Sequence, residues 1–330
     1  MKKAKYIILF LCLITLRESF SQCLLYNESK LAATNYSTSL EYKNNFYFVG
    51  DGVNDSDETK DYSNTNAIIV KTDMCGSKIW RKFYNHLGFD NGITNIIIID
   101  GFLYIIGQTN ENAYKTTSYI AKINANGDLI WYKVFNYKND YDITFFGMLA
   151  VENKIIAYGY YNYDLNQKTN FNSYIMEIDT GGNILHDKSN NLCLTESFEG
   201  ITKLFHLDSG YLCLMGVESN YYFNNKWNNY HWGMLNCKLN DNFNIISIDT
   251  FKSEYTTANN LIDYNENIKK FIIHLTKIVS SDSTHRQIAF LDSTGKLEKI
   301  IEDPYSPIYY PQKPNSLPRW MVSKLGRGLG

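Results

Sequence analysis

The sequence predicts an all-β protein, a β-propeller of about five four-stranded blades, from two repeated signals and a composition rich in strand-forming and turn-forming residues. The chain contains 27 Tyr and 18 Phe, which favour strands, and is also rich in Asn, which favours turns. Hydrophobic residues make up 44% and charged residues 20%, the proportions of a globular protein with a core. A net charge of −2 provides no global field to attract nucleic acid or an anionic membrane.

An apolar run that ends in glycine recurs along the chain. The runs end at Gly50, Gly107, Gly159 and Gly216. Successive copies lie roughly 55 residues apart, close to the period of propeller blades. A fifth copy keeps the spacing and ends in His274 instead of glycine. This period indicates one supersecondary unit repeated five times.

A turn signal recurs in phase with this run. In each copy an Asp or Asn opens a four-residue turn, at Asp73, Asn124, Asp179, Asn240 and Asp292. A side-chain oxygen at the first position holds such a turn, and a closing glycine takes the positive φ. We therefore assign a structural role in turn formation to the recurring Asp residues, Asp73, Asp179 and Asp292.

Tryptophan follows the first two turns, at Trp80 and Trp131, within near-copies of one strand. These rings are expected to pack between blades. Each period reads as four strands, which in the second copy are residues 93–99, 102–107, 118–123 and 128–135. The first two strands are apolar on both faces, as in a sheet pressed between two neighbours.

Domain boundaries follow from the repeats and from the proline content. Five periods fill a propeller at residues 22–303, and a truncated chain would belong to a propeller of six to seven blades. All five prolines lie between Pro304 and Pro318, and the last ten residues are basic and rich in glycine. Proline cannot donate to a β-ladder, so residues 304–330 are predicted to be a Pro/Gly-rich tail or linker. The sequence of this tail ends abruptly, so a natural chain with further residues is an alternative.

The N-terminus has the features of an export signal. Three lysines within the first five residues precede an apolar run at residues 6–16, and small residues stand at Ser19 and Ser21, the positions that a signal peptidase reads. The run is too short for a stop-transfer helix, which needs about 20 residues. The sequence therefore predicts a signal peptide at residues 1–21 and a secreted or cell-surface protein without a membrane span. Lipidation of Cys23 is the alternative.

The repeat also resembles a known group of proteins. The repeated unit is a strand ending in Gly, a long loop, and then the segments Lys71-Thr72-Asp73-Met74-Cys75-Gly76 and Trp80-Arg81-Lys82-Phe83. This unit resembles repeats in secreted β-propeller proteins of Bacteroidota. The resemblance covers residues 31–303 and implies architecture; its motifs say little about activity. A weaker likeness is to quinoprotein-like and outer-membrane assembly propellers, whose turn usually has one more residue.

Motifs for catalysis, metal binding and thiol redox chemistry are missing from the sequence. The six His residues are scattered without metal-ligand spacing, and no Cys-x-x-Cys or Gly-x-Ser-x-Gly occurs. Cys213 and Cys237 lie in strand-like runs and are interpreted as core residues. No cofactor is therefore expected. The acidic segment at residues 51–61 is interpreted as a solvated loop, with a Ca²⁺ site as the alternative.

Connections between second and third strands are predicted to be long and irregular, at residues 51–66, 108–117, 160–172 and 217–231. They emerge on the same face as the loops that join blades, and function concentrates on loops held by a rigid scaffold. Two of them combine aromatic rings with amides, which suits a protein or glycan partner. The candidate binding residues are Tyr160, Tyr161, Tyr163, Tyr221, Tyr222, Trp227, Tyr230 and Trp232.

The sequence thus favours an exported, non-catalytic propeller that binds a protein or glycan through its loop face. One alternative is an extracellular propeller enzyme, either a polymer hydrolase or a quinoprotein-like oxidoreductase, because a propeller can gather catalytic groups from several blades. Another is a structural segment of a larger secreted protein. The aromatic rings could also pack each loop against its own blade.

The export signal leads to a testable expectation. Because Ser21 is a small residue after a short apolar run, cleavage should leave Gln22 as the first residue of the mature chain, with or without cyclisation. Intact-mass analysis of the secreted protein measures this directly. A diacylglyceryl mass on Cys23 would overturn this cleavage site in favour of the lipoprotein.

Overall fold

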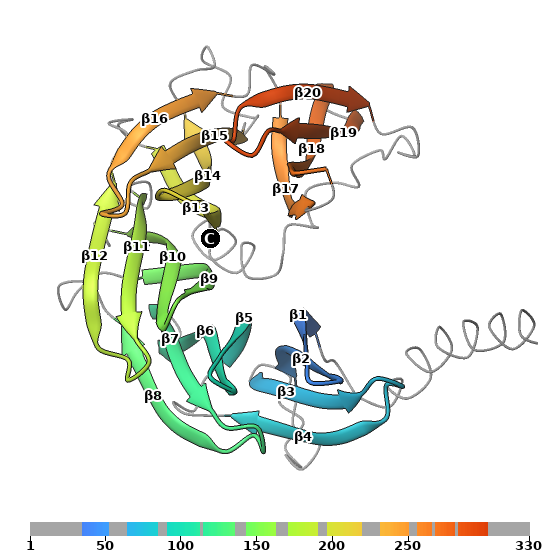
Figure 1. Ribbon diagram of the computed structural model, residues 1–330, viewed down its shortest axis with the longest axis vertical. Coiled ribbons are helices and arrows are strands. Elements are labelled where there is room, and N and C mark those ends of the chain that lie inside the picture. Colours follow the sequence, from blue (N-terminus) through green and yellow to red (C-terminus); the bar gives the residue numbers. More distant parts are fainter. Residues whose placement is uncertain are drawn as a thin grey trace, which may run out of the picture. The chain divides into compact units, whose positions relative to one another are not determined.

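The structure is a computed structural model that describes residues 35–52, 65–84, 91–112, 115–135, 143–162, 171–190, 197–219, 232–250, 256–265, 268–280 and 283–302. The chain forms two compact units. The first comprises residues 1–165 and 175–187, and the second comprises residues 166–174 and 188–330. The described residues of each unit consist of strands and short connections (Figure 1).

Twenty strands follow one another in five groups of four. The first group is β1 (Asn35–Tyr42), β2 (Asn45–Gly52), β3 (Asn66–Asp73) and β4 (Lys78–Tyr84). The second is β5 (Asn91–Ile99), β6 (Phe102–Asn112), β7 (Lys115–Ile123) and β8 (Leu129–Phe135). The third is β9 (Ile143–Val151), β10 (Lys154–Asn162), β11 (Phe171–Asp179) and β12 (Ile184–Asn190). The fourth is β13 (Ser197–His206), β14 (Tyr211–Ser219), β15 (Trp232–Leu239) and β16 (Ile245–Thr250). The fifth is β17 (Thr256–Asn265), β18 (Lys270–Ser280), β19 (Ser283–Leu291) and β20 (Leu297–Glu302).

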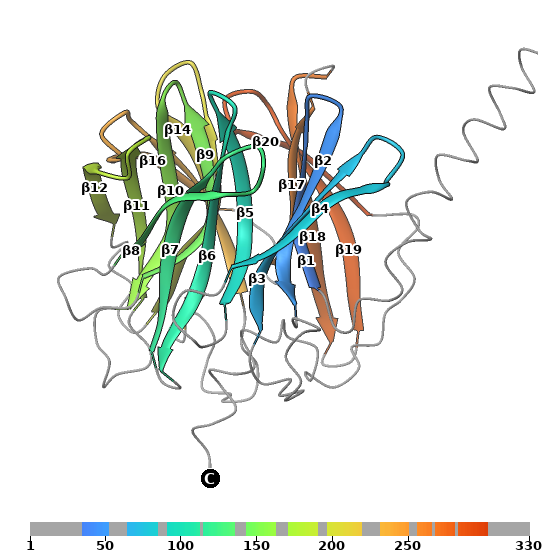
Figure 2. The same cartoon turned by 90° about the horizontal axis from the view of Figure 1, so that it is seen from below.

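Each group pairs in sequence order, first strand to fourth. A single parallel pair, Phe171 with Phe198, joins the third and fourth groups into one sheet. A four-stranded meander in this order is the blade of a β-propeller. The predicted fold class, all-β with five four-stranded blades, is confirmed, and within the described residues no helix interrupts the series. Within each blade the two tight turns lie at the same end (Figure 2).

The turn between third and fourth strands has the same hydrogen bonds in all five blades. In the second blade the Asn124 side-chain oxygen accepts from the backbone N–H of Asn126 and of Asp128, each at 2.9 Å. The Gly127 N–H donates to the Asn124 carbonyl at 2.9 Å, and Gly127 has φ +81°. The opening residues of the other four turns accept the same pair of N–H bonds, and these residues are Asp73, Asp179, Asn240 and Asp292. The structural role predicted for the recurring Asp residues is confirmed.

Phe243 replaces the closing glycine in the fourth blade. It keeps the left-handed backbone, with φ 58°, which is strained for a bulky residue. Its side chain is fully buried and its ring centre lies 5.2 Å from that of Tyr211. Burial of a large aromatic side chain contributes about 2 kcal/mol or more, enough to offset strain of that order.

The recurring glycine of the second strand lies beside a β-bulge. A Cβ on Gly107 would collide with the carbonyl oxygen of Gly92 on the neighbouring strand β5, and the register of β5 against β6 shifts between Ile93 and Asn95. Glycine is therefore required where the bulged strand approaches most closely. In the fourth blade the structure differs from the repeat pattern. Met215 pairs with Ile201 beside the bulge, one place before Gly216.

In the second to fifth blades, the carbonyl of the residue that closes the turn accepts a hydrogen bond from the preceding blade. In the first unit Tyr84 Oη donates to the Gly127 carbonyl at 2.8 Å, and Lys133 Nζ donates to the Gly182 carbonyl at 2.9 Å. In the second unit Asn190 Nδ2 donates to the Phe243 carbonyl at 3.1 Å. Asn236 Nδ2 donates to the Gly295 carbonyl in the same way.

Trp80 and Trp131 pack between successive blades, as predicted. Trp131 Nε1 donates to the Thr180 carbonyl, in the turn of the third blade, at 3.2 Å. Its ring lies edge-on to Tyr104 at 6.1 Å. Trp80 contacts Tyr47 in the same geometry and lies against the buried cluster of the first unit, which includes Val49, Ile69 and Ile105. A separate cluster in the second unit includes Leu212, Phe271 and Leu291.

Trp131→Ala should lower the free energy of unfolding by about 3 kcal/mol, because it removes a large partly buried ring and leaves the Thr180 carbonyl without its indole donor. Urea denaturation measures the change. The neighbouring Ile130, which is 48% exposed, offers a control, since Ile130→Ala should change stability by no more than about 0.5 kcal/mol. Equal effects of the two substitutions would show that the indole does not join the blades.

Candidate functional site

The two ends of the blades differ in how the chain connects the strands. At one end, tight turns join the first strand to the second and the third to the fourth. At the other end, the second strand of the first blade ends at Gly52 and the third begins at Asn66; the fourth blade has a similar gap between Ser219 and Trp232. We call this second end the connection end.

One predicted loop is wrong. The second blade was expected to have a long loop at residues 108–117, but β6 continues to Asn112 and β7 begins at Lys115. Thr109 and Thr117 form a register pair within this extension, and both side chains are fully buried. Polar side chains therefore belong to the strands here, not to a loop.

A layer of buried polar residues lies near the connection end of the first three blades. Its members come from the starts of β3, β5, β7, β9 and β11 and from the distal part of β6. They are Asn66, Asn91, Thr109, Thr117, Ser118, Thr144, Asn172 and Ser173. Sequence reasoning missed this layer. A signal was available, because polar residues precede the turn-opening residue by seven positions in each of the first three repeats.

These side chains bond to backbone at the strand ends. Thr117 Oγ1 donates to the Phe135 carbonyl at 3.1 Å, and Ser173 Oγ donates to the Asn190 carbonyl at 2.9 Å. The Phe145 N–H donates to Ser118 Oγ, from the third blade to the second, at 2.9 Å. Buried hydrogen bonds of this kind rigidify what they join, so the layer fixes the points from which the connections leave.

Thr109 is the exception within the layer. Its Oγ1 is buried and has no hydrogen-bond partner, although its register neighbour Thr117 is bonded. A buried hydroxyl without a partner costs about 1–3 kcal/mol.

A small cavity lies between the first and second blades. It has a volume of about 10 Å³ and is lined by Tyr84, Asn91, Ile105, Tyr119, Ala121, Leu129 and Tyr132. Burial raises the pKa of Tyr84, with the Asp128 charge adding to the effect, and burial likewise raises the pKa of Tyr119. Both phenols therefore stay protonated and cannot act as a base near neutral pH. The space holds no more than one water molecule, so this cavity is not a substrate site.

The turn carboxylates are likewise engaged in structure. The N–H of Asn183 holds the pKa of the Asp179 carboxyl below its usual value. Lys82 and Asn124 lower the pKa of Asp128. Among the residues that the structure describes, no group of three His, Cys, Asp or Glu is arranged to hold a metal ion. Of the acidic segment at residues 51–61, only Asp51 and Gly52 are described, at the end of β2.

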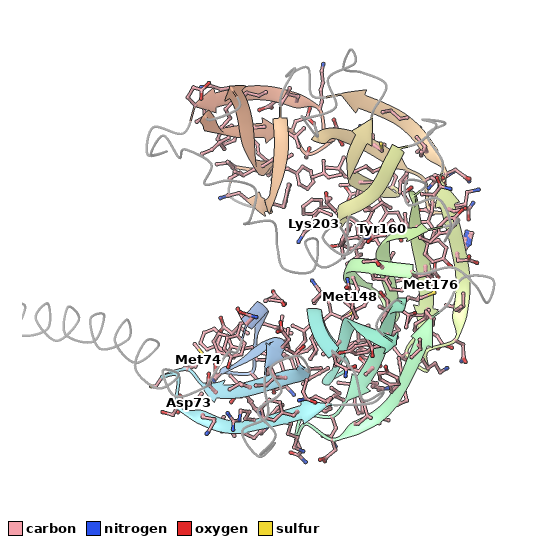
Figure 3. All side chains as sticks on the ribbon, turned by 180° about the vertical axis from the view of Figure 1, so that it is seen from behind. Asp73, Met74, Met148, Tyr160, Met176 and Lys203 are labelled. Atoms are coloured by element: carbon pink, nitrogen blue, oxygen red, sulfur yellow. The ribbon has the colours of Figure 1, made fainter. Side chains whose placement is uncertain are left out.

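The predicted binding residues are placed in part. Tyr160 and Tyr161 were expected in a loop, but they lie on β10 and are 5% and 8% exposed. Tyr160 is labelled in Figure 3. The Tyr160 ring packs 5.3 Å from Phe146. Because β10 continues to Asn162, both residues lie within a strand, where their side chains are buried in the core. Their assignment to an exposed patch is therefore wrong. Trp232 begins β15, with only its backbone described, and Tyr163, Tyr221, Tyr222, Trp227 and Tyr230 lie outside the described residues.

Comparison with known proteins gives no family. No family model matches the chain, and no curated protein is significantly similar to it. In the described part of the chain, no helix has the length and apolarity needed to cross a membrane.

Solved structures show a distant likeness. A subtype N10 neuraminidase-like protein from a little yellow-shouldered bat isolate of Guatemala is 8% identical with a TM-score of 0.46, over 81% of this chain and 80% of that chain. A variant of Synechocystis apocarotenoid oxygenase is 10% identical with a TM-score of 0.45, over 81% of this chain and 60% of that chain. A Bombyx mori GH32 beta-fructofuranosidase is 10% identical with a TM-score of 0.44, over 88% and 70%. Likeness at this level assigns no activity to the chain.

The polar layer gives a prediction with an internal control. Thr109→Val replaces a buried hydroxyl that has no partner by a methyl of similar size, so the free energy of unfolding should rise by about 1 kcal/mol. Thr117→Val, directly opposite, should lower it by about 1 kcal/mol or more, because the Phe135 carbonyl loses its donor. Urea denaturation of both variants measures the difference. A loss of stability in Thr109→Val equal to that of Thr117→Val would contradict the assignment.

Proposed function

We propose that the chain is an exported, non-catalytic β-propeller that binds a protein or a glycan through the connection end of its blades. The observation that carries this proposal is the contrast between the two ends. At the turn end, the opening side chain of every third-to-fourth turn is already bonded to its own backbone. At the connection end, a buried polar layer fixes strand ends of the first three blades, and 12 residues separate β14 from β15 in the fourth.

This arrangement suits binding because it separates a rigid support from variable connections. Binding residues are commonly found on loops that a rigid scaffold positions, and fixed supports lower the entropy lost on association. Segment 220–231 contains four Tyr or Trp residues, Tyr221, Tyr222, Trp227 and Tyr230, among five Asn residues. Aromatic rings beside amides offer stacking and hydrogen bonds together, which suits a sugar ring or a polar protein surface.

Tyr160 and Tyr161 take no part in the proposed surface, because they are buried in β10. The proposed anchors are therefore Trp227 and Tyr222, with Tyr221, Tyr230, Trp232 and Tyr163 as candidate neighbours. Trp227 and Tyr222 belong to the segment between β14, which ends at Ser219, and β15, which begins at Trp232.

The proposal is tested by binding followed by substitution. The protein is screened on arrays of glycans and of extracellular proteins, and each ligand found is titrated against Trp227→Ala and Tyr222→Ala. Replacing an anchor of a binding surface costs about 2 kcal/mol or more, roughly a thirtyfold loss of affinity. The melting temperature of both variants should stay near that of the wild type.

Ile246→Ala is the matched control. Ile246 is 65% exposed at the turn end of the same blade, so its loss should change neither affinity nor stability. Anchor variants that bind every ligand as tightly as the wild type would refute the proposed surface. Release of soluble product from a bound glycan would show catalysis and refute the non-catalytic assignment.

A further inference from the structure

Two cysteines face each other across the centre of the fourth blade. Cys213 on β14 and Cys237 on β15 are direct register partners, and both side chains are fully buried. In the structure both are thiols, and Cys237 Sγ lies 3.6 Å from Met215 Sδ. Both residues belong to the second unit.

The backbone at this pair has the dimensions of a disulfide. Directly opposed residues on antiparallel strands have Cα atoms about 4.5 or 5.5 Å apart, depending on the kind of pair. Both values lie within the range that a disulfide spans, about 4.4–6.8 Å. Their Cβ atoms, about 4.5–5.5 Å apart, need to approach by about 0.7–1.7 Å to reach the mean separation in a disulfide, about 3.8 Å, with a rotation of the side chains.

The equivalent positions of other blades contain no cysteine. In the first, second and fifth blades, the residue three places before the turn opener pairs with a residue of the second strand. These pairs are Phe48 with Val70, Ile105 with Ala121, and Ile273 with Ala289. In the fourth blade both members of this pair are cysteine. A small apolar core residue could account for one cysteine, but it does not account for two cysteines that face each other.

We infer that Cys213 and Cys237 form a cross-strand disulfide. The thiolate of one cysteine attacks a disulfide of the donor class, such as a thiol oxidoreductase or a small-molecule disulfide, and releases one donor thiol. The thiolate of the second cysteine then attacks the mixed disulfide and releases the other. The protein loses two protons and two electrons, and the donor disulfide gains them as two thiols.

The bond forms before the ladder between β14 and β15 closes. Burial raises the pKa of the Cys213 thiol, so the thiolate that exchange requires is scarce in the folded blade. Once formed, the disulfide fixes β14 to β15 near the turn end of the fourth blade, two register pairs from Tyr211 and Leu239. This inference does not depend on the proposed binding function, since it concerns the covalent state of the blade alone.

The test maps the bond in the full chain. The Cys75→Ser variant, which lacks the one exposed cysteine among the described residues, is produced in an oxidising compartment. It is denatured in excess N-ethylmaleimide, digested without reductant and analysed by mass spectrometry. A peptide linking Cys213 to Cys237, lost on reduction, is expected. Alkylation of both cysteines, or linkage of either to another cysteine, would overturn the inference.

A double-mutant comparison tests it independently. If the disulfide exists, Cys213→Ala and Cys237→Ala remove the same bond, so each lowers the melting temperature by roughly 5–10 °C and the double variant by little more. If both are thiols, no bond is lost, and a reductant leaves the melting temperature of the wild type unchanged. The Ile105→Ala substitution, at the matching position of the second blade, measures the cost of an ordinary core truncation.

Discussion

The structure depends on one repeated interaction, the hydrogen bond that each of the first four blades donates to the turn of the next. The carbonyl that accepts it belongs to the residue with positive φ, because that conformation turns the carbonyl away from its own hairpin. The donor varies among Tyr84, Lys133, Asn190 and Asn236, while the acceptor position is constant. A backbone acceptor makes no demand on side-chain identity, which explains how the repeats have diverged in sequence and kept the same contact.

This constraint also explains what the sequence could predict. The turn opener and the positive-φ residue are each fixed by local chemistry, and so their spacing revealed five blades of four strands. Long-range register leaves no comparable trace in the sequence. In the fourth blade Met215, not Gly216, lies at the bulge. The pairing of β13 with β14 is shifted by one residue relative to the other blades, and the spacing of the glycines in the sequence does not reveal this shift.

The errors at the connection end have a different cause. Residues 108–117 read as a loop because their hydrophobic pattern ceases, yet a β-ladder is built from backbone bonds and continues through polar residues when their side chains find partners. Thr117 does so, and as a β-branched residue it also favours strands. Tyr160 and Tyr161 illustrate the same ambiguity, because a tyrosine ring suits either a core or a binding surface. Only the extent of β10 decides between them.

The outer strand of each blade shows how the repeat limits unwanted association. In the first, second, fourth and fifth blades, the register between third and fourth strands shifts immediately after the turn. The additional residues of the bulge are Ile79, Ile130, Ile246 and Glu298. Three of these are exposed aliphatic side chains, and they lie on a strand with one unpaired edge. A bulge increases the local twist of that edge and disrupts its ladder, which disfavours addition of a further strand. The short turn that docks on the preceding blade and the bulge that disrupts the outer edge are thus adjacent in one hairpin, so the same local segment serves blade stacking and edge protection.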